Sequence, residues 1–206
     1  MQVSETVFLI SFCISASILF LMFIKAITRN PIDPSEAKGS TIKGIVYSFT
    51  AGMSPLKKET ANKHWPTYIA GICYHFGIFL GFFWLFIHVS NISLVSIIYS
   101  FSRFIFIISI ISGFGILLKR IINKKLRYLS NPDDYISNTL VTGFLIISLL
   151  NLYTISLRPL LWYYSAFLFL YIPVGKLKHA AYFILARIYL GLFYGKRGVW
   201  PLAKEN

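Results

Sequence analysis

Residues 68–89 read YIAGICYHFGIFLGFFWLFIHV and contain no Asp, Glu, Lys or Arg. An α-helix needs about 20 mostly apolar residues to cross the hydrocarbon of a bilayer, because each residue advances it by about 1.5 Å. This run therefore predicts a membrane-spanning helix. His75 and His88 are the polar exceptions in an otherwise apolar stretch, which makes them candidates for function.

Four further apolar runs of similar length occur in the chain. They cover about residues 6–27, 94–118, 136–157 and 160–185. Each approaches or exceeds the length that a helix needs to cross the hydrocarbon. All seven acidic residues lie outside the five runs. The sequence therefore predicts an all-α membrane protein with five transmembrane helices, in a single integral-membrane domain over residues 1–206.

The composition supports the same class of protein. Of the 206 residues, 56% are hydrophobic and 13% are charged, and the formal net charge is +13. An average soluble domain contains about 25% charged residues. The positive charge alone would also fit a nucleic-acid-binding protein. However, the basic residues flank apolar runs instead of covering a soluble surface, so we expect no nucleic-acid partner.

The placement of the basic residues predicts an orientation. Eighteen of the twenty Lys and Arg residues lie in three segments, about 25–63, 119–127 and 176–204. The other two connections, about 90–93 and 156–160, contain only Arg158. Because Lys and Arg accumulate in cytoplasmic loops, we expect the N-terminus outside and the C-terminus in the cytoplasm. The expected location is the cytoplasmic membrane of a bacterium or an archaeon, as a multi-pass protein.

The residue types inside the spans argue against two classes of function. Proton pumps and cation transporters usually need a carboxylate within the membrane, and no expected span contains one. Cys13 and Cys73 lack the C-x-x-C spacing of a metal or redox pair, so this chain alone provides no iron–sulfur or zinc site. The candidates that remain are the histidines and Arg103.

His75 and His179 are the main candidates for holding a metal cofactor. His75 lies about 10 Å from the cytoplasmic end of its span, where an unpaired polar group costs several kcal/mol. His179 lies in the cytoplasmic half of the last span, so both imidazoles are expected near the same membrane face. Two such imidazoles can hold haem iron axially. The alternative is that both are packing residues or line a transport path.

Arg103, His88, Tyr99 and His64 are secondary candidates. Arg103 lies inside the third span, where a haem propionate, a quinone carbonyl or a lipid phosphate would be its partner, unless it extends to the lipid headgroups. His88 is expected at the outer membrane interface. Together with Arg103 and Tyr99 it is a candidate for a quinone pocket. His88 and His64 are also candidates for ligands of a second haem.

Two stretches of the sequence are similar to a known family. Residues 74–83, YHFGIFLGFF, resemble the second helix of the respiratory nitrate reductase gamma subunit, and residues 172–180, IPVGKLKHA, resemble the end of its last helix. The five-span layout also fits that family, which includes cytochrome b subunits of heterodisulfide-reductase-like complexes and of the transmembrane redox complexes of sulfate reducers. The resemblance implies that His75 and His179 are the axial ligands of a haem b.

The outer haem of that family is not matched in this chain. Its two ligand positions correspond to Leu85 and Leu161, which are aliphatic. The resemblance therefore implies one haem b near the cytoplasmic face and no second haem. It also implies an electron-transfer subunit of a quinol-linked oxidoreductase complex, without catalysis of its own, that works with a quinone such as menaquinone.

The expected partners follow from the same resemblance. A cytoplasmic iron–sulfur subunit would dock on the basic segments 28–67 and 186–206, although lipid headgroups also attract such segments. A periplasmic multihaem cytochrome is the other expected partner. The competing class is a non-redox membrane protein, either a small transporter or an assembly factor, in which the histidines are structural.

Overall fold

The computed structural model describes residues 2–28, 35–55 and 64–201 of the chain. These residues form helices and no strand. Among them, four helices are long and apolar enough to cross a membrane, and a broken pair of helices makes a fifth span if its members count as one. The structure therefore confirms the predicted all-helical chain, with four or five helices long and apolar enough to span a membrane. The orientation of the spans in a membrane stays a prediction.

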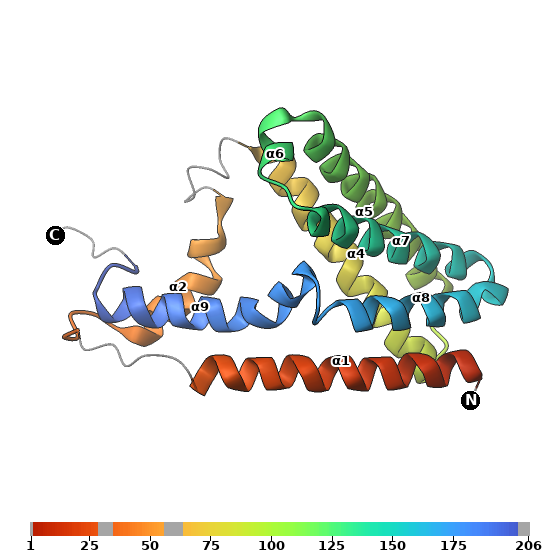
Figure 1. Ribbon diagram of the computed structural model, residues 1–206, viewed down its shortest axis with the longest axis horizontal. Coiled ribbons are helices and arrows are strands. Elements are labelled where there is room, and N and C mark those ends of the chain that lie inside the picture. Colours follow the sequence, from red (N-terminus) through yellow and green to blue (C-terminus); the bar gives the residue numbers. More distant parts are fainter. Residues whose placement is uncertain (1, 29–34, 56–63, 202–206) are drawn as a thin grey trace. The chain divides into compact units, whose positions relative to one another are not determined.

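The helices follow the expected order along the sequence (Figure 1). The long ones are α1 (Val3–Thr28), α4 (Trp65–Val89), α5 (Ser96–Ile122), α7 (Pro132–Tyr153), α8 (Arg158–Tyr171) and α9 (His179–Lys196). The short ones are α2 (Thr41–Phe49), η1 (Ala51–Met53), α6 (Lys124–Tyr128), η3 (Ile155–Leu157) and η4 (Lys176–Lys178). The first three expected spans agree closely with α1, α4 and α5.

The helix α7 begins and ends earlier than the expected span at 136–157 because a polar capping box fixes its start. The Asn131 side chain accepts a hydrogen bond from the Asp134 N–H at 3.1 Å, and the Asp134 carboxylate accepts one from the Asn131 N–H at 3.0 Å. Pro132 occupies the first helical turn, where its missing N–H costs nothing. Hydropathy alone does not detect this start, since these residues are polar.

The expected span at 160–185 corresponds to two helices, α8 and α9, with a break between them, so it is one span only if the pair is counted together. The helix α8 has Ile172 as its C-cap. The next residue, Pro173, has no N–H to extend the ladder of helical hydrogen bonds. The Gly175 N–H instead donates to the Tyr171 carbonyl at 2.9 Å, and the chain restarts as η4 and α9. His179 is consequently the first residue of a new helix.

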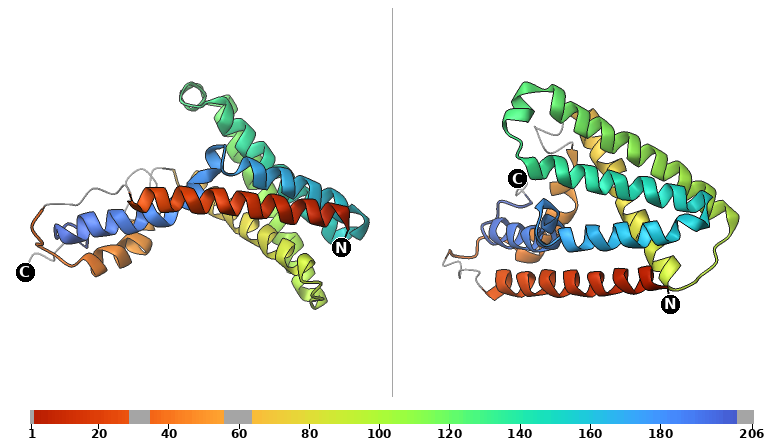
Figure 2. Two further views of the ribbon diagram at one scale, coloured as in Figure 1. Left: turned by 60° about the horizontal axis from the view of Figure 1, so that its bottom comes forward. Right: turned by 45° about the vertical axis from the view of Figure 1, so that its right-hand side comes forward.

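The contacts within the chain define two compact units, and each is described by itself. The first unit contains Met1–Ala16 and Pro66–Leu177, and the second contains Ser17–Trp65 and Lys178–Asn206. In the first unit, α5 lies beside α7 and α7 lies beside α8 (Figure 2). In the second unit, α2 lies along α9.

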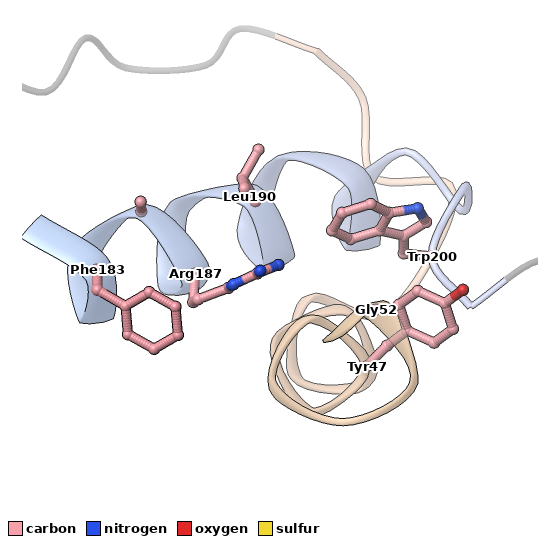
Figure 3. Close-up of a pocket in the computed structure, with 7 residues that line it drawn as sticks. Tyr47, Gly52, Phe183, Arg187, Leu190 and Trp200 are labelled. Atoms are coloured by element: carbon pink, nitrogen blue, oxygen red, sulfur yellow. The ribbon is translucent and has the colours of Figure 1, made fainter. Parts of the chain in front are cut away.

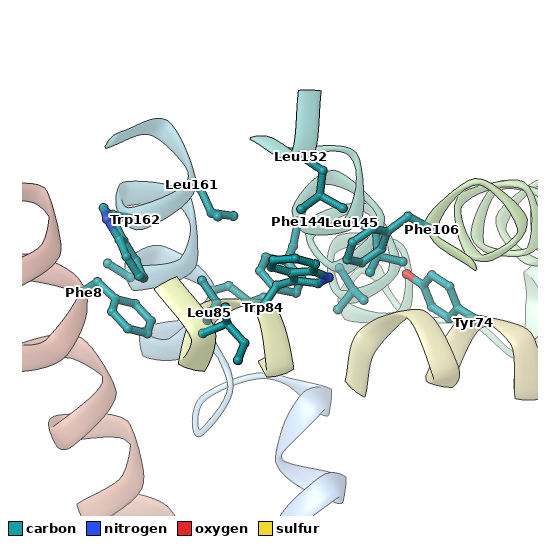
Figure 4. Close-up of a cluster of buried hydrophobic side chains, with 14 residues drawn as sticks. Phe8, Tyr74, Trp84, Leu85, Phe106, Phe144, Leu145, Leu152, Leu161 and Trp162 are labelled. Carbon is teal, nitrogen blue, oxygen red and sulfur yellow. The ribbon is translucent and has the colours of Figure 1, made fainter. Parts of the chain in front are cut away.

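Large apolar side chains fill the core of the first unit. Its most deeply buried members are Trp84, Phe106, Phe144, Leu145, Leu161 and Trp162. Figure 4 shows Trp84, Phe144 and Leu145 gathered where α4 approaches α7. The helices α4 and α5 come close together at Gly77, where a Cβ atom would overlap the Ser109 side chain. The Ser109 hydroxyl donates to the Cys73 carbonyl at 2.7 Å and fixes this crossing.

The second unit is built on a backbone-to-backbone contact between α2 and α9. A Cβ atom on Gly44 would overlap the backbone of Gly191 and Gly195. The Ser48 hydroxyl lies 2.7 Å from the Arg187 carbonyl of α9. The segment 28–67, which we expected to be a loop surface, therefore contains a helix that packs on the C-terminal helix. Residues 29–34, 56–63 and 202–206 of the expected basic docking surface lie outside the described residues.

Asp134 connects three elements of the first unit, which leads to a prediction about stability. Its carboxylate lies 3.1 Å from Arg120 and 2.6 Å from Lys176, besides capping α7. Asp134→Ala should cost about 1–2 kcal/mol, because it removes both ion pairs and the cap. Asp134→Asn keeps an acceptor for the cap and should cost less. The thermal unfolding midpoint in mild detergent measures both, and a midpoint for Asp134→Ala equal to that of the wild type would contradict the prediction.

Candidate functional site

His75 lies on a face of α4 that its own unit leaves exposed. Its Nδ1 atom is 2.7 Å from the Gly71 carbonyl, one helical turn earlier. A carbonyl only accepts hydrogen bonds, so Nδ1 carries the proton and Nε2 keeps a free lone pair. Apart from the backbone of the same helix turn, no atom of the described residues lies within 4 Å of the position that a Cβ atom on Gly71 would occupy. The imidazole thus keeps its Nε2 lone pair available for a metal, on an exposed face of α4.

His179 is the first residue of α9 and is exposed. It belongs to the second unit, whereas His75 belongs to the first. The axial pair of His75 and His179 therefore stays a prediction, to which each unit contributes one histidine. His64 is exposed in the turn before α4 and also belongs to the second unit.

His88 is buried within the first unit, with 8% of its surface exposed. A guanidinium nitrogen of Arg158 lies 3.3 Å from its Nδ1 atom. Because a guanidinium only donates, Nδ1 accepts and the Nε2 atom of His88 carries the proton. The rings of Trp84 and Trp162 lie 5.5 Å and 6.4 Å from the imidazole. His88 is therefore enclosed by protein, with the Asn151 side chain as a further polar neighbour.

Arg103 finds its partner at the end of α7. Its guanidinium donates to the Leu152 carbonyl at 3.0 Å and lies 4.4 Å from the centre of the Tyr153 ring. A cation is favourable at this position, since the last carbonyls of a helix have no partner within the helix. A cofactor or a lipid was the expected partner of Arg103, and the Leu152 carbonyl provides at least one contact instead. Tyr99, one turn earlier on α5, packs on Trp84 with 4.7 Å between ring centres.

These residues form what we call the buried polar cluster. It consists of Trp84 and His88 at the end of α4, Tyr99 and Arg103 at the start of α5, Asn151 at the end of α7 and Arg158 at the start of α8. Within this cluster, six buried polar atoms make no hydrogen bond to the described residues: Trp84 Nε1, His88 Nε2, the Nε atoms of Arg103 and Arg158, and both amide atoms of Asn151. Neither arginine is ion-paired with a carboxylate of the described chain.

The buried polar cluster is rich in donors and poor in acceptors. Leaving such atoms unsatisfied costs about 1–3 kcal/mol each, so water or a ligand must meet them. A ligand that carries only acceptors, such as a carbonyl compound or an anion, fits the available N–H groups. The cluster can therefore bind and orient an oxygen atom that accepts hydrogen bonds, within the hydrophobic part of the unit.

An apolar cavity of about 350 Å³ opens in the same unit. Its walls include Phe8 and Phe12 of α1, Phe82 and Leu85 of α4, and Phe169 of α8. Phe8 packs on Trp162 with 4.8 Å between ring centres, and Trp162 lies next to His88 in turn. The cavity is thus linked to the buried polar cluster through the contacts of Phe8 with Trp162 and of Trp162 with His88.

The two leucines at the expected positions of outer haem ligands have structural roles. Leu85 is 3% exposed and Leu161 is 1% exposed, and both belong to the hydrophobic core of the first unit. Neither can coordinate a metal, and both are packed among aromatic side chains. Their burial is compatible with the expectation of a single haem, which stays a prediction.

Sequence reasoning did not assign Arg158, Asn151 or Trp84 to a site. Arg158 was counted only as a charge in an outer connection, although it is the first residue of the apolar helix α8. Asn151 is a single amide near the end of an apolar run, which by itself is a weak signal. The order of the helices gives a better signal for these residues. One short connection joins the end of α4 to the start of α5, and another joins the end of α7 to the start of α8.

No protein-family model, curated protein or solved structure matches this chain. The resemblance of residues 74–83 and 172–180 to a cytochrome b family accordingly remains a prediction. The function has to be argued from the geometry of the two histidines and of the buried polar cluster.

Proposed function

We propose that the chain is a haem b membrane subunit that passes electrons between the quinone pool and a partner redox subunit. The observation that carries the proposal is the hydrogen bond of 2.7 Å between the Nδ1 atom of His75 and the Gly71 carbonyl. Ligating histidines typically donate their second ring N–H in this way, which fixes the ring and raises its basicity. A histidine needed only for packing would be buried, and His75 is exposed.

The surroundings of His75 suit a large flat group. The exposed neighbours on this side of α4 are apolar, with Phe76 and Phe79 at 65% and 68% exposure. The open space at Gly71 leaves room for a ring to approach the helix. His75 and His179 would hold a haem b, which supplies reversible one-electron transfer when bound. His179 is exposed at the start of α9.

A partner subunit is part of this proposal, because the chain offers no group for two-electron chemistry on a soluble substrate. A cytoplasmic iron–sulfur subunit on the basic segments 28–67 and 186–206 is the first candidate. A periplasmic multihaem cytochrome is the second. Basic side chains of the described part of these segments include Lys38, Lys43 and Lys196, which would attract an acidic protein surface.

The buried polar cluster supports a quinone as the membrane substrate. A quinone head presents only carbonyl acceptors, which matches the unpartnered N–H groups of Trp84, His88 and the two arginines. Its prenyl tail is apolar, which matches the linked cavity of about 350 Å³. His88, Tyr99 and Arg103 are therefore proposed as quinone-binding residues, and menaquinone is the expected quinone.

The proposal is tested by expressing the wild-type chain with ample haem and purifying it in mild detergent. The pyridine haemochrome assay should give about one haem b per chain, because a single pair of axial ligands is available. A chain that folds and carries no haem under these conditions would contradict the proposal and favour a small transporter or an assembly factor. A chain with two haems would contradict the single-haem assignment.

The quinone assignment has its own test in Arg103→Leu. This change should slow haem reduction by a soluble menaquinol analogue by about tenfold or more, because a charged hydrogen bond is worth about 1.5–3 kcal/mol. Haem content should stay unchanged. Arg127→Leu, on the exposed helix α6, removes the same charge and is the matched control. An Arg103→Leu protein that is reduced at the wild-type rate would contradict the assignment.

A further inference from the structure

We propose that the second unit binds the phosphate of an anionic phospholipid in a cavity beside Arg187. The cavity has a volume of about 490 Å³, and its walls include Tyr47 of α2, Phe183 and Arg187 of α9, and Trp200 (Figure 3). All of its lining residues belong to the second unit. The proposal is independent of the haem and of the quinone, since it involves neither His75 nor the buried polar cluster.

The cavity is a built feature and not a gap between loosely packed segments. The close contact of Gly44 with Gly191 and Gly195 holds α2 against α9. The ring of Trp200 packs between Tyr194 and Tyr47, with 4.5 Å and 5.4 Å between ring centres. The N–H groups of Val199 and Trp200 donate to the Tyr194 carbonyl, which fixes the segment that carries Trp200. The walls are thus held in place before any ligand binds.

Arg187 supplies the charge in this cavity. Its guanidinium carbon lies 5.5 Å from the centre of the Phe183 ring. In Figure 3 its side chain lies between the rings of Phe183 and Trp200, with α2 opposite. No ion pair joins Arg187 to a carboxylate within the described residues. A guanidinium binds a phosphate through two parallel hydrogen bonds, which makes a phosphate ester a matching ligand.

The charge of the second unit selects for an anion. Its described residues include seven Lys and Arg side chains, and Glu36 is the one acidic residue among them. A zwitterionic headgroup would bring a quaternary ammonium into this positive surface, whereas a phosphatidylglycerol headgroup brings only the negative charge.

The surface around the cavity suits a lipid better than free phosphate. Large apolar side chains are exposed on both helices, including Ile42 and Val46 of α2 and Ile184 and Leu190 of α9. These side chains would contact acyl chains, while Tyr47 and Trp200 have the amphipathic rings that favour the interface between headgroups and hydrocarbon. Free phosphate would use only the guanidinium and leave the apolar surface in water.

The test uses the full-length protein in mild detergent and native mass spectrometry. The probes are dihexanoyl phosphatidylglycerol, dihexanoyl phosphatidylcholine and inorganic phosphate, each added to delipidated protein. The variants are Arg187→Gln and, as the matched control, Arg197→Gln. Arg197 lies in the same unit, stacks 3.6 Å from the centre of the Phe193 ring and does not line the cavity. Haem content and the unfolding midpoint are recorded for each variant, so that loss of the fold is recognised.

The wild-type protein should retain one phosphatidylglycerol more tightly than phosphatidylcholine. Arg187→Gln should weaken that binding by about tenfold or more, whereas Arg197→Gln should leave it within about twofold. Equal loss in both variants would overturn the proposal, because the binding would then reflect diffuse charge. Equal binding of the two lipids, or displacement by inorganic phosphate at comparable concentration, would overturn it as well. A wild-type protein without haem that shows the expected lipid pattern would refute the proposed function and leave this proposal standing.

Discussion

His75→Ala is expected to lower the haem b content of the purified protein by about 10- to 100-fold, since even the loss of an indirect partner of a metal ligand costs that much affinity. The reduced-minus-oxidised spectrum should lose its α band accordingly. The His75 side chain is exposed in its own unit, so its removal should leave the fold and the unfolding midpoint of the apoprotein nearly unchanged. Haem loss without loss of fold is the result that separates a ligand from a packing residue.

The other histidines of the chain are internal controls for this experiment. His179→Ala should reduce the haem content as strongly as His75→Ala. His64→Ala and His88→Ala remove the same kind of side chain and should keep about one haem per chain, because neither is an expected ligand of the haem held by His75 and His179. If His88→Ala removed half of the haem, the chain would hold two haems and the single-haem assignment would be wrong. If His75→Ala kept its haem, the whole assignment of the ligand pair would fail.

Gly44→Ala is expected to lower the stability of the protein strongly. The added methyl group would overlap the backbone of Gly191 and Gly195, and a backbone cannot move aside as a side chain can. Overpacking usually costs about 1–3 kcal/mol, and the gain in helix propensity from glycine to alanine returns only about 1 kcal/mol. The helix α2 should therefore separate from α9, which lowers the unfolding midpoint and also weakens lipid binding at Arg187.

Gly115→Ala is the matched control for this change. Gly115 lies within α5, and apart from the backbone of its own helix turn no atom of the described residues lies within 4 Å of the position of its added Cβ atom. The same substitution should there raise the unfolding midpoint or leave it unchanged, because only the helix propensity changes. The two variants are thus expected to shift the midpoint in opposite directions. A Gly44→Ala protein as stable as Gly115→Ala would show that α2 and α9 are not in backbone contact.

The apolar helices could be predicted from the sequence because length and hydropathy determine them. The helices α1, α4 and α5 lie where the apolar runs predict, within a few residues. The start of α7 could not be found in this way, since it depends on polar groups of Asn131 and Asp134. The break after α8 could have been predicted, because Pro173 was visible in the run and its missing N–H ends a helix.

The candidate site could be predicted only in part. The positions of His75 and His179 on helices follow from the sequence, but the tautomer of His75 depends on the Gly71 carbonyl and needs coordinates. The contact between Arg158 and His88 joins residues far apart in the sequence, so no local pattern reveals it. The packing of α2 on α9 depends on glycines in two distant segments. The cavity beside Arg187 lies between these segments, so the sequence did not predict it either.

Near-infrared magnetic circular dichroism of the oxidised wild-type protein tests the central claim most directly, because its charge-transfer band reports the two axial ligands of a low-spin haem. For the wild-type protein, the account predicts the band of a bis-imidazole haem. For the His179→Ala variant, it predicts that any haem still bound gives a high-spin spectrum. A band that requires any other ligand pair in the wild-type protein, or a folded protein with no haem band at all, would contradict it.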